Sequence, residues 1–295
     1  MMGPVDDELA AAIDSSLNAL LAALDLHPTG EDRFSVDPAT SGLNGRVFGG
    51  QLLAQAVIGT SATVPGKDIH PLHATFARAG TPGAAVDVQV AHVRDGRSMA
   101  TRQVAITEGG EALLVATASF AGHHDEPDVT LPAPVVPPPD DTPLLQALVG
   151  EAPNGRHWIE QPPAVELRLP EPPSFITGTT SREPRSHWMR LPRSVGADHA
   201  LNAALLAYAS DFFLMDMVFR AHPEALGPGR ANGFSLDHAI WFHRPVRFDA
   251  WHLHTQETVA VVGDRGLSRG AIHDADGRCV ASVAQEVLLR LGAPA

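Results

Sequence analysis

Residues 205–219 read LLAYASDFFLMDMVF, a long and predominantly apolar run. A helix made from it would be apolar on most faces, so other parts of the chain must enclose it. Two aspartates, Asp211 and Asp216, interrupt the run with no basic residue directly beside them. An ionised carboxylate in apolar surroundings costs several kcal/mol unless a partner compensates it. The stretch therefore predicts a buried helix that carries a functional acidic side chain.

A second apolar segment occurs earlier in the chain, and the same order of elements follows both. The predicted helices cover 48–63 and 197–220. The predicted strands cover 69–79, 85–94, 97–107 and 110–121, and then 236–244, 249–262, 264–273 and 277–290. Landmarks recur at an offset of roughly 166 residues, as internal repeats do: His73-Ala74 and His238-Ala239, Arg102 and Arg269, Gly110 and Gly277.

Each unit then has one enclosed helix with an antiparallel sheet curved around it, which predicts an α+β fold of the tandem double hot-dog type. A proline-dense stretch, HHDEPDVTLPAPVVPPPDDTP, separates the units and tolerates neither a helix nor a central strand. We expect an N-terminal helix plus a first hot-dog domain over 1–122, a proline-rich linker over 123–145, and a second hot-dog domain with the catalytic residues over 146–295.

Composition limits the partners and the compartment. The chain of 295 residues has a net charge of −13, which opposes binding to nucleic acid or to an anionic membrane. Cys279 is its one cysteine, so neither an internal disulfide nor a cysteine-based zinc site can form within the chain. No export signal or peroxisomal address is visible. We expect a cytoplasmic protein that needs no cofactor.

Several short motifs, taken together and in order, resemble the type II acyl-coenzyme A thioesterases. In the first half they are GRVFGGQLLAQA (45–56), HATFARAGTP (73–82), VRDGRSMATRQV (93–104) and TASFAG (117–122). In the second half they are LAYASDF (206–212), SLDHAIWFHRP (235–245) and ASVAQEVLLR (281–290). The resemblance implies two hot-dog units in one chain and hydrolysis of a fatty acyl-CoA thioester to a fatty acid and CoA.

The resemblance also implies a catalytic set of an aspartate, a hydroxyl residue and a glutamine, which fall on Asp211, Ser235 and Gln285. Asp211 would activate a water molecule that the other two position, and this chemistry requires no metal. The segment GFSLD lacks the second glycine of a nucleophile elbow, which argues against an acyl-enzyme on Ser235. Helical spacing allows Arg220 to satisfy Asp216, which leaves Asp211 without a local partner.

Five further residues are candidates for contact with the substrate. Gly49 and Gly50 would let backbone N–H groups at the start of the first helix approach the ligand and stabilise an oxyanion. Coenzyme A carries phosphates, and Arg78, Arg94 and Arg97 are candidates to bind them.

The repeat predicts a single site in each chain, because Gln285 corresponds to Ala118 in the first unit. Two other classes stay open: a hot-dog dehydratase or hydratase that uses His238 with a carboxylate, and an acyl-CoA binding module without turnover. The histidines in HH (123–124) and HLH (252–254) lack a third metal ligand at a suitable spacing. Association into a homodimer or a homotetramer is open as well.

Overall fold

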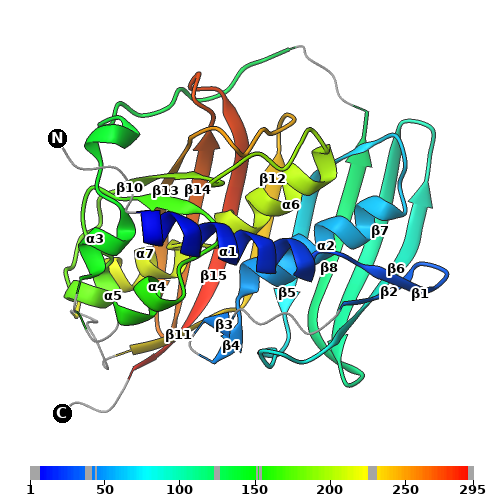
Figure 1. Cartoon of the computed structure of the whole chain (residues 1–295), viewed down its shortest axis with the longest axis horizontal. Coiled ribbons are helices and arrows are strands. Elements are labelled where there is room, and N and C mark those ends of the chain that lie inside the picture. Colours follow the sequence, from blue (N-terminus) through cyan, green and yellow to red (C-terminus); the bar gives the residue numbers. More distant parts are fainter. Residues whose placement is uncertain are drawn as a thin grey trace.

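The computed structural model is α+β, with helices lying on one face of a large antiparallel sheet (Figure 1). It describes residues 7–36, 42–43, 45–122, 127–150, 152, 155–224 and 231–291. The helices are α1 (Asp7–Ala23), α2 (Gly49–Ala62), α3 (Leu145–Val149), α4 (Arg156–Glu160), α5 (Ser174–Thr177), α6 (His199–Ser210) and α7 (Leu214–Ala221), with a short 3₁₀ helix at Pro139–Asp141. The strands are β1 (His27–Gly30), β2 (Arg33–Val36), β3 (Gly42–Leu43), β4 (Arg46–Val47), β5 (Asp68–Phe76), β6 (Val86–Asp95), β7 (Met99–Glu108), β8 (Glu111–Ala121), β9 (Glu166–Arg168), β10 (Arg185–Arg190), β11 (Ala231–Ser235), β12 (Asp237–Phe242), β13 (His252–Val262), β14 (Arg265–His273) and β15 (Cys279–Leu291).

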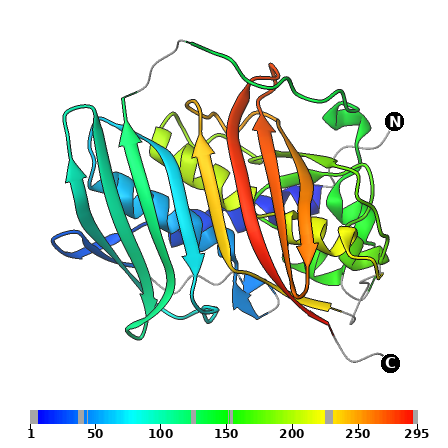
Figure 2. The same cartoon turned by 180° about the vertical axis from the view of Figure 1, so that it is seen from behind.

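The main sheet is continuous across both halves of the chain (Figure 2). Its order is β1-β2-β6-β7-β8-β5-β12-β15-β14-β13-β10-β9, and β11 pairs with the last part of β15. The halves join where β5 pairs with β12. On one side of this join the strand order is β5-β8-β7-β6, and on the other side it is β12-β15-β14-β13, so the two halves have corresponding strand orders. These eight strands are the eight that the sequence predicts, with ends shifted by at most three residues.

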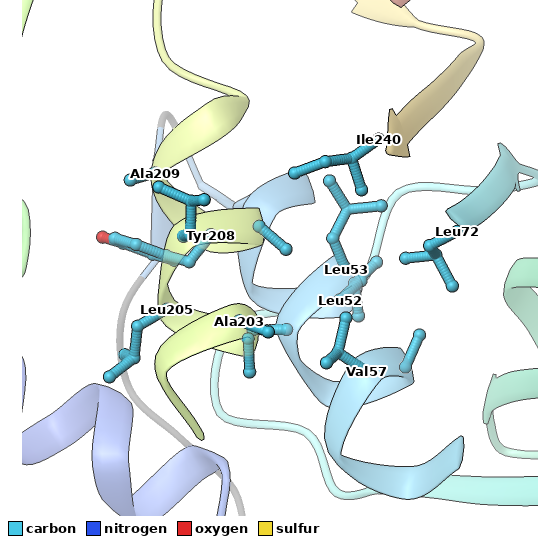
Figure 3. Close-up of a cluster of buried hydrophobic side chains, with 14 of the residues drawn as sticks. Leu52, Leu53, Val57, Leu72, Ala203, Leu205, Tyr208, Ala209 and Ile240 are labelled. Atoms are coloured by element: carbon cyan, nitrogen blue, oxygen red, sulfur yellow. The ribbon is translucent and has the colours of Figure 1, made fainter. Parts of the chain in front are cut away.

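The apolar helices α2 and α6 pack side by side against the sheet. Leu53 and Leu205 from these helices lie in one buried cluster with Ile240 from the sheet (Figure 3). Burying each such side chain stabilises the fold by about 1.5–3 kcal/mol. α1 packs over α2, where Gln55 Nε2 donates to the Ala23 carbonyl at 3.0 Å. Enclosure from several sides explains why both helices are apolar on most faces, and the predicted tandem double hot-dog fold is confirmed.

The helix predicted over 197–220 is broken in two, which corrects the sequence prediction. α6 ends at Ser210, and α7 begins at Leu214 after Phe213, whose φ of 67° is left-handed. This conformation is unfavourable for a bulky residue, so the packing of the buried Phe213 ring must hold it. The segment His199–Ala221 has the length and hydropathy of a membrane span, but 89% of its apolar window is buried in the protein. The break places Asp211 at the C-cap of α6.

The proline-rich segment runs along the second unit. Residues 127–138 contain no helix or strand, while 123–126 of the predicted linker lie outside the described residues. Asp128 forms an ion pair with Arg244 at 2.8 Å, and Trp188 Nε1 donates to the Pro137 carbonyl at 2.9 Å. The segment is therefore fastened by specific contacts, and the predicted domain limits at 122 and 145 stay a prediction.

The N-terminal helix contacts both units. The helix α1 packs on α2 of the first half. Its Asp14 also forms an ion pair with Arg193 of the second half at 2.6 Å. The sequence prediction grouped this helix with the first unit, which follows it directly in the chain, and the ion pair with Arg193 is a contact that sequence proximity does not reveal.

Gly50 marks a very close approach of α2 and α6. A Cβ at this position would lie 2.3 Å from the Tyr208 carbonyl oxygen, which cannot move without shifting α6. Gly50→Ala should therefore lower the free energy of unfolding by about 1–3 kcal/mol, although Ala favours helix more than Gly does. Gly30→Ala is the control, since its Cβ would meet nothing nearer than 3.8 Å. Equal midpoints of urea unfolding for the two variants would contradict this packing.

Candidate active site

The side chains of Asp211, Ser235 and Gln285 lie together in the structure. Asp211 caps α6, Ser235 ends β11, and Gln285 lies in the middle of β15. Ser235 pairs with Val287 across the two strands, so its side chain shares a face with that of Gln285. Gln285 Nε2 donates to Ser235 Oγ at 2.9 Å, and the Gln285 side chain is also hydrogen-bonded to the Asp211 carboxylate. One amide thus joins the carboxylate to the hydroxyl.

The Asp211 carboxyl is buried, with 8% of the residue exposed. Burial disfavours the charged form and raises the pKa of Asp211 to about 6. Hydrogen bonds from the Gly50 N–H and from Gln285 favour the charged form and limit this rise. Gly50 is the second residue of α2, so the positive end of that helix faces the carboxylate. A carboxyl with a pKa near 6 is ionised at neutral pH and still basic enough to accept a proton.

Both glycines that the sequence singled out lie against Asp211. A Cβ on Gly49 would be 2.8 Å from Asp211 Oδ2 and 3.2 Å from the Phe76 ring, so only glycine allows this approach. The Gly50 N–H, predicted as an oxyanion donor, is instead hydrogen-bonded to the carboxylate. Contact of these glycines with the substrate stays a prediction.

His238 holds the Gln285 amide in place, a role that sequence reasoning missed. The His238 ring is fully buried, and its Nδ1 lies 2.7 Å from Gln285 Oε1. An amide oxygen only accepts, so Nδ1 must carry the proton and Nε2 is an acceptor. Nε2 lies 3.0 Å from Ser210 Oγ, which is also 2.9 Å from the Ala207 carbonyl oxygen, so these two acceptors share the single Ser210 hydroxyl proton. Burial lowers the pKa of His238 to about 4, which keeps the ring neutral. The Gln285 N–H groups must then face Ser235 and Asp211.

Asp216 has a structural role. Arg185 Nη1 lies 2.7 Å from its carboxylate, which also accepts from the backbone N–H groups of Ser174 and Phe175. Arg220, the partner that helical spacing predicted, instead forms an ion pair with Glu171. That prediction was wrong because it considered only neighbours on the helix. Asp216 is fully compensated, which leaves Asp211 as the buried carboxylate without a cation among the described residues.

The candidate phosphate-binding arginines do not lie together. Arg78 is engaged by Glu108 and by Glu111, the latter at 3.4 Å. Arg94 and Arg97 belong to the β6–β7 turn region, where Arg102 donates both to the Arg94 carbonyl and to the Thr63 carbonyl. Thr63 follows the last residue of α2, whereas Asp211 lies at its first residues, and 14 helical residues span roughly 20 Å. The structure therefore does not bring Arg94 and Arg97 to Asp211.

A cavity of about 410 Å³ with a mixed polar and apolar lining lies next to the end of α6, where Tyr208 and Phe212 flank Asp211 in the sequence. Phe48, Tyr208 and Phe212 line it, and Phe48 stacks on Phe212 with ring centroids 4.7 Å apart. Burial, with a contribution from the Asp211 charge, raises the pKa of Tyr208 to about 12, so its hydroxyl stays neutral. The other walls come from α1, α4 and the residues that follow α4. Sequence reasoning missed the cavity because α4 lies in a region without clear periodicity.

The first unit has apolar residues where the second has His238 and Gln285. Those two residues are opposite each other in β12 and β15, and Leu72 and Ala118 hold the corresponding places in β5 and β8. The predicted correspondence of Gln285 with Ala118 agrees with these registers and stays a prediction. The correspondence of His73 with His238 is wrong, because His73 is exposed and His238 faces the interior.

The dehydratase alternative requires His238 to reach a substrate proton. The ring is fully buried, and both its nitrogens are occupied by Gln285 and Ser210, so the geometry gives no support to that role. Within the part of the chain that the structure describes, no group of three histidine, cysteine or acidic side chains could hold a metal ion. The pair at 123–124 lies outside that part.

Comparison with known proteins identifies the class. Residues 37–121 match the family model of the acyl-CoA thioesterase N-terminal domain, and residues 133–289 match that of the C-terminal domain. Acyl-coenzyme A thioesterase 8 of Mus musculus is 30% identical over 287 residues, which covers 92% of this chain and 88% of the mouse protein. Acyl-CoA thioesterase 2 of Haemophilus influenzae is 29% identical over 256 residues, which covers 83% of this chain and 88% of that protein. The solved structure of acyl-CoA thioesterase II TesB2 from Mycobacterium marinum is 28% identical, covers 94% of this chain and 99% of that one, and superposes with a TM-score of 0.76.

Fold and matched domains together define a thioester hydrolase built from two hot-dog units. The chain belongs to the type II acyl-CoA thioesterase family. The resemblance seen in short motifs is thereby confirmed over both halves. Because the protein is an enzyme, the binding module without turnover is set aside.

Replacing Asp211 by Asn should stabilise the protein at neutral pH. The folded state holds the Asp211 proton more tightly than the unfolded chain does, since the pKa is about 6 instead of 3.8. Ionisation therefore costs folding free energy that grows as pH rises through 4 to 6 and then levels off. We expect Asp211→Asn to exceed the wild type by up to roughly 3 kcal/mol near pH 8, and to match it near pH 4.

Urea unfolding at both pH values measures this difference. Asp216→Asn is the matched control, because weakening a buried ion pair should destabilise the fold by a few kcal/mol. A stabilisation by Asp211→Asn that is the same at both pH values would show that ionisation is not its cause.

Replacing His238 by Phe should raise the pKa of Asp211 above about 6. The Phe ring keeps the packing but removes the Nδ1–H donor, so the Gln285 amide can turn and its hydrogen bond to the carboxylate weakens. Gln285→Ala should shift the pKa in the same direction, and Ser210→Ala should shift it less. The pH dependence of thioester hydrolysis reports the shift. Reduced activity in His238→Phe with an unmoved pKa would mean that His238 serves packing alone.

Proposed function

We propose that the protein hydrolyses fatty acyl-CoA to a fatty acid and CoA, using a water molecule that Asp211 activates. The observation that carries the proposal is the Gln285 amide, which joins a buried carboxylate of raised pKa to the Ser235 hydroxyl. The relatives named as acyl-CoA thioesterases support the choice of substrate. A cytoplasmic location and assembly into a homodimer or a homotetramer stay predictions.

The proposed reaction begins with water hydrogen-bonded to the Asp211 carboxylate and to Ser235 Oγ. As the water oxygen bonds to the thioester carbon, Asp211 accepts a proton from it. The tetrahedral intermediate then breaks its C–S bond, and the departing thiolate takes that proton from Asp211. A group with a pKa near 6 suits both steps, because it exchanges protons readily at neutral pH.

The hydrogen-bond pattern supports direct attack by water over an acyl-enzyme. A serine nucleophile needs a neighbouring base to accept its proton. Ser235 Oγ instead accepts from Gln285 Nε2, and the buried imidazole of His238 is occupied on the far side of that amide. The Ser235 O–H is thus suited to orient a water molecule and poorly suited to attack.

The cavity next to the end of α6 is suited to the acyl chain. Its volume of about 410 Å³ falls in the usual range for small-ligand sites, and its lining includes Phe48, Trp158 and Phe212. Two of its lining residues, Tyr208 and Phe212, flank Asp211 in the sequence, and the Asp211 charge acts on Tyr208, which supports placing the thioester of a bound acyl chain near Asp211.

Release of free thiol from a series of acyl-CoA chain lengths tests the proposal. We expect the wild type to release thiol, and Asp211→Asn to lose about 10²–10⁴-fold in kcat, the usual contribution of a general base. Ser235→Ala and Gln285→Ala should lose less, because each only positions the water. Asp249→Asn, at a carboxylate paired with Arg247, is the control and should keep wild-type kcat.

Two results would reject the mechanism. One is undiminished kcat in Asp211→Asn. The other is acylated protein found by mass spectrometry during turnover and absent from Ser235→Ala, which would establish a serine nucleophile.

A further inference from the structure

Two arginines from distant parts of the chain lie against one phenylalanine ring. The guanidinium carbon of Arg46, on β4, is 4.4 Å from the centroid of the Phe234 ring on β11. The guanidinium carbon of Arg290, near the end of β15, is 5.3 Å from the same centroid. Both distances are typical of cation–π interactions. Such an interaction holds a guanidinium over the ring and leaves its N–H groups available to a ligand.

No carboxylate neutralises this pair within the described residues. Several other arginines of this acidic chain are paired, as Arg244 is with Asp128 and Arg269 with Glu257. The shared ring keeps Arg46 and Arg290 within about 10 Å of each other, which is close enough for one multiply charged anion to contact both. Two unpaired cations in a chain of net charge −13 indicate a place for an anionic ligand.

The pair is close in the chain to two residues of the candidate active site. Phe234 directly precedes Ser235 and, by strand alternation, projects from the opposite face of β11. Arg46 precedes Gly49 by three residues, and Val47 N of β4 donates to the carbonyl of Gly80, in the segment that follows β5. A ligand held by the two guanidiniums would have to pass the edge of β11, which pairs only with β15 among the described strands, to reach Ser235 and Asp211.

We propose that Arg46 and Arg290 bind phosphate groups of coenzyme A, with Phe234 fixing the positions of the two guanidiniums. The inference rests on the proposed function, because it assigns the nucleotide end of the same substrate. Arginine suits the task, since its planar fork of donors matches phosphate oxygens. The substrate would then lie with its acyl chain in the cavity next to the end of α6, its thioester at Asp211 and its phosphates outside at the arginine pair.

Two thioesters of the same acyl group test the assignment: acyl-CoA, and acyl-pantetheine, which has no phosphate. In Arg46→Ala and Arg290→Ala we expect KM for acyl-CoA to rise about tenfold each, as loss of a charge-assisted hydrogen bond does, with kcat unchanged. KM for acyl-pantetheine should stay at its wild-type value. Arg46→Lys should retain part of the affinity. Arg269→Ala, at an arginine paired with Glu257, is the matched control and should leave both KM values unchanged.

Equal loss on both thioesters, or no loss on acyl-CoA, would overturn the assignment. Calorimetric binding of CoA itself separates this inference from the hydrolysis proposal, because CoA is not hydrolysed. We expect CoA to bind the wild type and the Asp211→Asn variant alike, and about a hundredfold more weakly to the double variant Arg46→Ala/Arg290→Ala. Unchanged CoA affinity in the double variant would refute the arginine site even if hydrolysis proceeds as proposed. Absence of hydrolysis with intact, arginine-dependent CoA binding would refute only the proposed function.

Discussion

The close meeting of two helix ends is the constraint on which the site depends. The start of α2 and the end of α6 approach until the Gly50 N–H reaches the Asp211 carboxylate, and a Cβ on Gly50 would strike the Tyr208 carbonyl. Because α2 belongs to the first unit and α6 to the second, neither unit alone could make this contact. The continuous sheet through β5 and β12 holds the two helices side by side. The fold thus buries a carboxylate while giving it enough hydrogen bonds to ionise near neutral pH.

The two units share a framework and differ in its polar interior. His238 and Gln285 are opposed on β12 and β15 where Leu72 and Ala118 are opposed in the first unit. Leu72 and Ala118 contribute to the hydrophobic core. His238 instead orients the Gln285 amide so that an N–H group faces the Asp211 carboxylate. Burying Asp211 costs folding free energy, and the same burial gives the carboxyl the basicity that the proposed chemistry needs. Stability and activity are therefore opposed at this residue.

The sequence predicted what depends on local pattern. Alternation predicted the eight central strands, and the lack of a basic neighbour singled out Asp211. The break at Phe213 could not be predicted, because distant packing holds its left-handed backbone. The ion-pair partner of Asp216 could not be predicted either, because Arg185 precedes it by 31 positions. The distance of Arg94 from Asp211 also depends on tertiary structure, since Arg94 lies near the other end of α2. His238 gave no signal of its own, since a neutral histidine that orients an amide has the same sequence signature as one that merely packs. The roles of Asp211, Ser235 and Gln285 were inferred from family motifs, and the structure adds the hydrogen bonds that join them.

Direct titration of the Asp211 carboxyl tests the account most closely. The infrared difference between the wild type and Asp211→Asn isolates the carbonyl stretch of this one protonated carboxyl, which can be followed as pH changes. The account predicts a band that disappears with a midpoint near pH 6. A midpoint at or below about 4, the ordinary range of an aspartate in water, would contradict a desolvated base at this position.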